Sequence, residues 1–110
     1  MSAGWKILRR APAVLALVSF VAGADEMVAV DILGYKYVPA EVTIHVGDTV
    51  KWTNREKRTS HSVLFPAENG LESERLFPDE SWERRFTKAG RYDYTCTPHP
   101  EMKGVVIVGE

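Results

Sequence analysis

Cysteine is almost absent from this chain, because its 110 residues contain only one, Cys96. A single thiol cannot form a disulfide within the chain, so the cross-links that stabilise many small exported domains are excluded. An unpaired cysteine is then a buried thiol, a link to a second molecule, or a thiolate with a chemical role. The cysteine count alone does not separate these three possibilities.

Long apolar runs are also absent. The longest uncharged apolar stretch, Ala11 to Ala22, has 12 residues, whereas a helix that crosses a bilayer needs about 20. Three basic residues lie among the first ten positions, and the small residues AGA follow the run, as in a site for signal peptidase. We therefore expect residues 1–24 to be a signal peptide, with an uncleaved anchor as the alternative, and residues 25–110 to form the mature domain.

The expected mature segment has no excess of positive charge. It holds all 15 acidic residues but only 11 of the 14 basic ones, which gives a net charge of −4. Proteins that bind nucleic acid neutralise phosphates with clustered lysine and arginine side chains. We therefore expect no nucleic-acid partner.

Alternating apolar and polar residues fill most of the mature segment. In EVTIHV, Glu41–Val46, every second residue is apolar, which is the period of a half-buried strand, and His45 falls on the polar face. Turn residues separate further short strands. These six strands are expected at Met27–Ile32, Thr49–Asn54, Ser62–Phe65, Ser81–Phe86, Arg91–Thr95 and Gly104–Val108.

This pattern predicts one all-β domain, an antiparallel sandwich or barrel. The segment from Ala67 to Leu76 departs from it, and there Asn69 could cap a helical turn. We find no internal repeat and no second domain.

The segment YDYTCTPHPEM, residues 92–102, places a thiol, an imidazole and a thioether at three-residue spacing. Cys96, His99 and Met102 follow an expected strand, so a single loop can present all three side chains. Sulfur and imidazole ligands favour copper or zinc over magnesium or calcium. The prolines on both sides of His99 restrict the loop before any metal binds.

A fourth ligand has to come from elsewhere, and His61 is the best candidate. It lies 35 positions before Cys96, after a charged loop and at the start of an expected strand. Taken singly, a cysteine at a strand end is often a small buried side chain, and Met102 could be core filler. The combined motif C-x-x-H-x-x-M with flanking prolines is what favours a metal site.

The segment GRYDYTCTPHPEMKGVVIV, taken with VTIHVGDTVKWTNRE and the histidine that follows it, resembles the cupredoxins, or small blue copper proteins. It is most similar to amicyanin and related bacterial plastocyanin-like proteins, over about Val28 to Val108. The resemblance implies an eight-stranded Greek-key β-sandwich with one type 1 copper ion at one end. The implied ligands are His61, Cys96, His99 and Met102.

The chain departs from the amicyanin pattern at four places. The loop NREKRTSH is one residue longer and lacks a proline directly before His61, and Ser62 replaces an asparagine. Glu101 stands where a phenylalanine is usual, and Arg84 occupies an inward position that is usually apolar. The first two changes alter the surroundings of the site, and Glu101 alters the docking surface.

Hydrogen bonds to the cysteine sulfur tune a copper site. Two backbone amides of such a site are placed to donate, those of Ser62 and of the residue two after the cysteine, but that residue is Pro98, which has no N–H. We expect one such bond, from Ser62, and a lower reduction potential than with a non-proline at position 98. The Ser62 hydroxyl could also tie its loop to the loop at Thr97.

The implied function is that of an electron carrier in the periplasm, not an enzyme, because four protein ligands leave no open position for a substrate. A copper carrier is the main alternative, and a cysteine–histidine hydrolase is a distant third. The implied partners are a c-type cytochrome, a periplasmic dehydrogenase such as methylamine dehydrogenase, or an oxidase. We expect a monomer without membrane insertion after signal cleavage. The loop before His61 is either a basic rim for an acidic partner or a solvated loop, and its basic residues are Arg55, Lys57 and Arg58.

Overall fold

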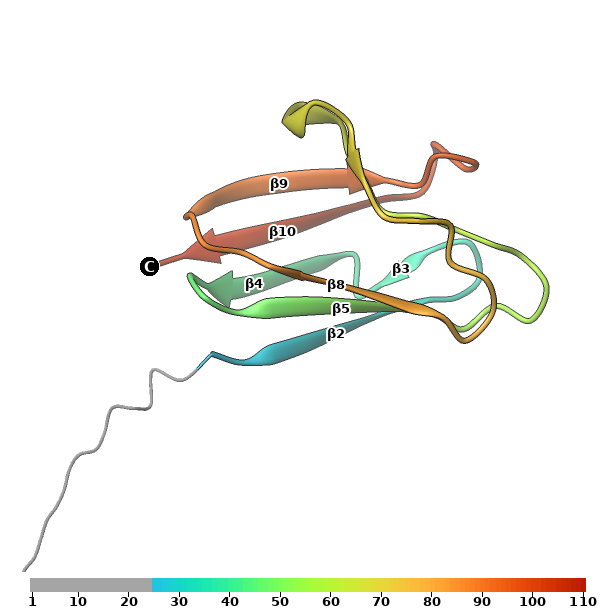
Figure 1. Cartoon of the computed structure of the whole chain (residues 1–110), viewed down its shortest axis with the longest axis horizontal. Helices are drawn as coiled ribbons and strands as arrows, with labels where there is room; N and C mark the ends of the chain where they lie inside the picture. Colours follow the sequence, from blue (N-terminus) through green and yellow to red (C-terminus); the bar gives the residue numbers. More distant parts are fainter. Residues whose placement is uncertain (1–24) are drawn as a thin grey trace, which may run out of the picture.

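Two β-sheets make up the computed structural model, which describes residues 25–110 (Figure 1). The signal peptide expected over residues 1–24 lies outside this range. One sheet has the order β3-β2-β5-β8 and is formed by Tyr37–Val38, Met27–Ile32, Thr49–Asn54 and Ser81–Arg85. The other has the order β4-β10-β9-β6-β7 and is formed by Glu41–His45, Lys103–Gly109, Gly90–Thr95, Leu64–Phe65 and Leu71–Glu72.

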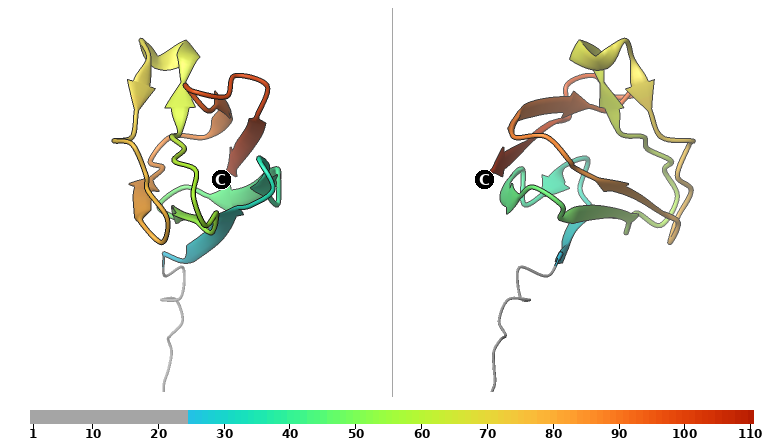
Figure 2. Two further views of the ribbon diagram at one scale, coloured as in Figure 1. Left: turned by 90° about the vertical axis from the view of Figure 1, so that its right-hand side faces the viewer. Right: turned by 60° about the vertical axis from the view of Figure 1, so that its left-hand side comes forward.

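The expected all-β sandwich is confirmed, but its sheets are mixed and not purely antiparallel. β2 pairs with β5 in parallel, and β4 pairs with β10 in parallel, whereas the other pairs are antiparallel. The parallel pairs arise because the chain leaves the first sheet after β3, forms β4 in the second sheet and returns as β5 beside β2. Two views from the side show the sheets facing one another across the core (Figure 2).

All seven expected strands are present, although the one expected at Ser62–Phe65 is shortened to β6, Leu64–Phe65. Two very short strands, β3 and β7, bring the count in residues 25–110 to nine. In β4, Val42 and Ile44 are buried while Thr43 and His45 are exposed, as the alternation predicts. The strand ends one residue earlier than expected, because Val46 lies in the turn with Gly47, whose φ of 101° suits glycine.

The helical turn expected between Ala67 and Leu76 is a single 3-10 turn that begins one residue earlier, Pro66–Glu68. Asn69 caps its C-terminal end in the left-handed conformation, with φ 59°, which asparagine tolerates better than most residues. Gly70 follows, and the chain then returns as β7 along β6. Among residues 25–110 there is no helix of the length and apolarity that a membrane span requires.

Aromatic rings fill the space between the sheets. Trp52 and Tyr94 are fully buried, with ring centroids 5.3 Å apart, and both rings pack on Phe65. The Tyr94 ring lies directly over Gly104, its partner in the β9–β10 pair, where any Cβ atom would collide with the ring. Gly104 is therefore required for this packing.

Arg84 points inward from β8, as the sequence indicated, and it forms two hydrogen bonds with the carboxylate of Glu68. Its guanidinium donates to both Glu68 oxygens, at 2.8 and 2.6 Å. It also lies over the rings of Phe65 and Phe86, 4.5 Å from each centroid. The charge is thus neutralised and covered by aromatic faces at the margin of the core, which is why an arginine is tolerated there.

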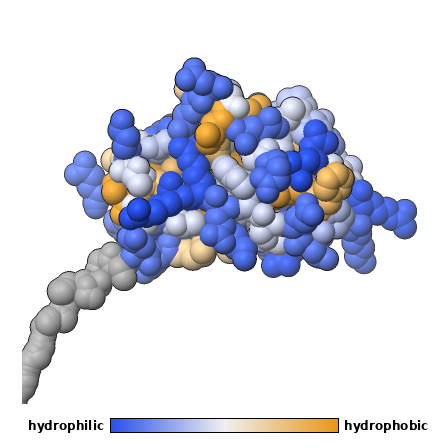
Figure 3. Space-filling view, in the orientation of Figure 1, coloured by the Kyte–Doolittle hydropathy of each residue, from blue (hydrophilic) through white to orange (hydrophobic). Residues whose placement is uncertain are grey.

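The loops that follow β5 and β9 meet at the end of the sandwich opposite the C-terminus (Figure 1). The first loop leads to His61, and the second carries Cys96, His99 and Met102. The face of the molecule in Figure 3 is mostly hydrophilic, with a few separate apolar areas.

Replacing Glu68 by glutamine should destabilise the fold by about 1–2 kcal/mol at neutral pH, because Arg84 loses its charged acceptor. The Arg84 hydrogen bond lowers the pKa of Glu68, so the stabilisation is present above the pKa of the unfolded chain and is lost as the pH falls through the folded-state pKa. In urea unfolding, the midpoint of the wild type should lie above that of Glu68→Gln at pH 7, and the two midpoints should converge as the pH is lowered.

The matched control is Asp93→Asn, which removes an exposed carboxylate that pairs with Arg91 at 3.2 Å. Its free energy of unfolding should stay within about 0.5 kcal/mol of the wild-type value. A Glu68→Gln protein as stable as this control at every pH would contradict the role given to the Arg84 pair.

Candidate metal centre

Three of the four expected ligands come together in the structure. The Sγ atom of Cys96 lies 3.7 Å from Nδ1 of His61 and 3.6 Å from Nδ1 of His99. All three donor atoms lie within 4.8 Å of one another. His61 and Cys96 are completely buried, whereas His99 is partly exposed.

Two successive backbone turns shape the loop that follows β9. The amide of His99 donates to the carbonyl of Cys96 at 3.1 Å, and the amide of Met102 donates to the carbonyl of His99 at 2.9 Å. Met102, the fourth expected ligand, is 2% exposed and directly precedes β10. Each three-residue interval of the motif, from Cys96 to His99 and from His99 to Met102, is therefore one hydrogen-bonded backbone turn.

His61 is fixed from the other side by a two-way backbone pair with Leu76. Its amide donates to the Leu76 carbonyl at 3.0 Å, and the Leu76 amide donates back at 2.8 Å. Buried Asn54 organises the preceding loop, since its Nδ2 donates to the carbonyls of Thr59 and Leu76 and its Oδ1 accepts from the Glu56 amide. Sequence analysis gave neither Asn54 nor Leu76 a role.

Ser62 connects the two loops, as the sequence predicted. Its amide donates to the Cys96 sulfur at 3.3 Å, and its hydroxyl accepts from the Thr97 amide at 3.0 Å. In residues 25–110 no second backbone amide donates to this sulfur, because Pro98 has none to offer. Both expectations for Ser62 are confirmed.

Tyr37 completes the support of Ser62 and was not anticipated. Its hydroxyl donates to the Ser62 carbonyl at 2.6 Å, and its side chain is buried. Burial, followed by the nearby Cys96, raises the pKa of Tyr37 far above its usual range. The phenol therefore keeps its proton, and the bond to Ser62 persists at any physiological pH.

The electrostatics of the site favour metal binding. Burial, and then the neighbouring His99, lower the pKa of His61, so this imidazole is neutral at physiological pH and its lone pair is free to bind a metal. Two imidazole nitrogens and one sulfur facing a common point form a donor set that suits copper or zinc. The residues present therefore fit a type 1 copper ion.

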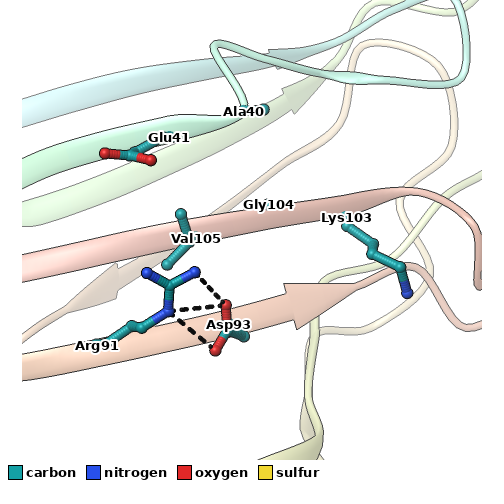
Figure 4. A pocket seen from close by; sticks show the side chains of 7 residues that line it. All are labelled: Ala40, Glu41, Arg91, Asp93, Lys103, Gly104 and Val105. Carbon is teal, nitrogen blue, oxygen red and sulfur yellow. Dashed lines mark hydrogen bonds and ion pairs between the residues drawn. The ribbon is translucent and has the colours of Figure 1, made fainter.

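Two hollows in the surface of residues 25–110 share the lining residues Ala40 and Lys103. One, of about 400 Å³, is lined by Tyr35, Lys36, Tyr37, Ala40, Glu101, Met102 and Lys103, so it reaches the fourth expected ligand. The other, of about 290 Å³, lies along β4, β10 and β9 and contains the Arg91–Asp93 ion pair (Figure 4). It contains none of the four expected ligands.

The remaining charged candidates are exposed side chains. His45 is exposed, as expected, and its Nδ1 lies 3.9 Å from Asp48. In the loop before His61, Arg55 pairs with Asp31 at 3.3 Å, while Lys57 and Arg58 are exposed. All three basic side chains named for the rim are therefore exposed, and Arg55 has an acidic partner.

Comparison with known proteins agrees with this geometry. The model of the family described as copper binding proteins, plastocyanin/azurin family, matches residues 24–109. Amicyanin of Paracoccus denitrificans is 44% identical over 89 residues, which cover 77% of this chain and 67% of the relative. Amicyanin-alpha of Methylorubrum extorquens is 40% identical over 91 residues, which cover 79% and 73%.

The fold matches solved amicyanins as well. A reduced amicyanin mutant superimposes with a TM-score of 0.72 at 41% identity, over 80% of this chain and 87% of that one. A Cu(I) amicyanin mutant gives a TM-score of 0.71 at 42% identity, over 74% and 80%. From its sequence, its sandwich fold and its cluster of histidine and cysteine donors, the chain belongs to the plastocyanin/azurin family of copper binding proteins.

Proposed function

We propose that this blue copper protein carries single electrons between redox partners in the periplasm. The observation that carries the proposal is the convergence of Nδ1, Sγ and Nδ1 within 4.8 Å at one end of the sandwich. The proposed ligands of one type 1 copper ion are His61, Cys96, His99 and Met102.

The bound copper supplies a one-electron couple between Cu(I) and Cu(II), and the chain holds the ligands still. Cys96 receives the Ser62 amide, His61 is paired with Leu76, and the His99 backbone is held by the Cys96 carbonyl. Donors held this way move little when the charge of the site changes, so the barrier to electron transfer stays low. His99, the one partly exposed donor, offers the shortest route to the surface.

Burial of the donors favours an electron carrier over the two alternatives. A copper delivery protein has to release its ion to a partner, yet His61, Cys96 and Met102 are at most 2% exposed. A cysteine–histidine hydrolase needs an acid or amide that orients its imidazole. Within residues 25–110 the Nδ1 atoms of His61 and His99 contact the cysteine sulfur, and no carboxylate accepts a hydrogen bond from either ring.

The proposed partners are a c-type cytochrome, a periplasmic dehydrogenase such as methylamine dehydrogenase, or an oxidase. Glu101 is exposed in the loop between His99 and β10, and Lys57 and Arg58 are exposed in the loop before His61. Partner choice therefore depends on charge as well as apolar contact, and transfer rates should depend on salt.

Adding Cu(II) to the copper-free protein should produce an intense blue band, because a thiolate bound to Cu(II) absorbs strongly by charge transfer. Cys96→Ser, which removes the thiolate, should bind copper without this colour. The matched control Ser60→Ala lies outside the donor cluster and should stay blue. The complexes are compared by visible absorption and electron paramagnetic resonance spectroscopy. A pale complex of the wild-type protein with Cu(II) would contradict the proposal.

Replacing Pro98 by alanine should raise the reduction potential. The new amide can donate to the Cys96 sulfur beside that of Ser62, and a second donor stabilises Cu(I). A bond worth about 1 kcal/mol corresponds to roughly 40 mV in a one-electron couple. Pro100→Ala, on the other side of His99, is the control and should leave the potential near the wild-type value in protein-film voltammetry. Equal potentials for all three proteins would refute the role of the missing amide.

A further inference from the structure

Tyr35 contacts both imidazoles of the proposed copper site. Its ring meets the His99 ring edge to face, with centroids 4.9 Å apart and an interplanar angle of 78°. It meets the His61 ring in the same way, at 5.4 Å and 87°. Edge-to-face packing of this kind is favourable between aromatic rings. Among residues 25–110 the other aromatic contact of either ring is the one between the two histidines, whose centroids lie 4.9 Å apart.

The backbone at Tyr35 adopts a conformation that tyrosine disfavours. The turn between β2 and β3 is closed by two reciprocal bonds, from the Leu33 amide to the Lys36 carbonyl and back, at 3.0 and 3.2 Å. Gly34 and Tyr35 both lie in the left-handed region, at φ 63° and 59°. Glycine or asparagine would suit the second position better, so local preference does not explain the tyrosine.

Two bonds hold Tyr35 against the loop that precedes His61. Its amide donates to a Glu56 carboxylate oxygen at 3.3 Å, and its hydroxyl lies 3.1 Å from the Thr59 hydroxyl. Glu56 is itself tied to buried Asn54 through its amide. The ring is therefore fixed at its backbone and at its tip, although the residue is 47% exposed.

The two imidazoles lack the support that metal-binding histidines usually have. Such a histidine normally donates its second ring N–H to a carboxylate, a carbonyl or water, which fixes the orientation of the ring. Here Nε2 of His61 is buried without a hydrogen-bond partner. In residues 25–110 no protein atom hydrogen-bonds Nε2 of His99 either. Apart from their contacts with the Cys96 sulfur and with one another, both imidazoles share the ring of Tyr35 as a packing partner that can orient them.

We propose that Tyr35 is a positioning residue for the metal centre, and the proposal rests on the function proposed above. Its ring holds the imidazoles of His61 and His99 with Nδ1 turned toward the Cys96 sulfur. The strained turn at positions 34 and 35 is the structural cost of placing an aromatic ring against both ligands. Tyr35 acts through the histidines and does not touch the metal.

The test compares three variants in copper-free and copper-loaded protein. Tyr35→Leu removes the ring, Tyr35→Phe keeps it, and Thr59→Val removes the hydroxyl partner while leaving the ring in place. Should the leucine variant fail to fold, Tyr35→Asn removes the ring at a residue that tolerates the left-handed backbone. The readouts are the line widths of the histidine ring protons in the copper-free protein, the Cu(II) spectrum, and the rate of reduction by a small inorganic reductant.

In Tyr35→Leu we expect the ring protons of His99 and His61 to broaden by exchange, because the imidazoles then move between orientations on the microsecond-to-millisecond timescale. The copper-loaded form should show an altered ratio of visible bands and a changed copper hyperfine splitting. Its reduction should slow by about fivefold, since the ligands then rearrange more between oxidation states. Tyr35→Phe and Thr59→Val lose the bond at the tip of the ring but keep the ring itself and the amide bond to Glu56, so in all three readouts they should lie much closer to the wild type than Tyr35→Leu does.

A change in chemical shift alone does not support the proposal, because losing any aromatic ring moves nearby resonances. Sharp histidine lines and a wild-type spectrum in Tyr35→Leu would overturn it, even if transfer to a protein partner became slower, since Tyr35 would then be a docking contact. The copper-free line widths decide the question independently of colour. A wild-type protein that failed to turn blue would remove the proposed function but leave this comparison intact.

Discussion

The hydrogen bond from the Ser62 amide to the Cys96 sulfur is the contact on which the metal centre depends. It joins the segment that follows β5 to the loop that follows β9, two parts of the chain 34 positions apart. Ser62 is held by two further bonds, to the Thr97 amide and the Tyr37 hydroxyl. One small residue thus fixes the distance between His61 and Cys96, and it does so at the atom whose electron density sets the reduction potential.

The sandwich places that contact at a rigid end of the molecule. Both loops leave from the ends of paired strands, and the aromatic core of Trp52, Phe65 and Tyr94 lies beneath them. The inward charge of Arg84 is neutralised by Glu68 at the margin of this core, so an unusual residue is accommodated without an unpaired charge. Because protein interiors pack densely, a framework of this kind resists the shifts that a change of copper charge would otherwise cause.

The sequence predicted what short-range patterns encode. Period-two alternation located seven strands, and the spacing of Cys96, His99 and Met102 located the loop that carries them, because all three follow one strand. It missed β3 and β7, which are too short to show a period, and the parallel β2–β5 pair, since alternation is the same for either strand direction. Tyr35 and Tyr37 were missed because they act on residues more than 20 positions away. Asn54 was missed because one of its bonds is to Leu76, 22 positions away, and its bonds to the nearby loop have no pattern in the sequence.

The central claim is that this chain holds two imidazoles and one thiolate at fixed positions around one copper ion while the charge of that ion changes. X-ray absorption at the copper edge, measured on the oxidised and the reduced protein, tests it most directly. We predict one sulfur and two imidazole nitrogens at nearly equal distances in both states at neutral pH. Loss of a nitrogen ligand or a large change in the copper–sulfur distance on reduction would contradict the claim.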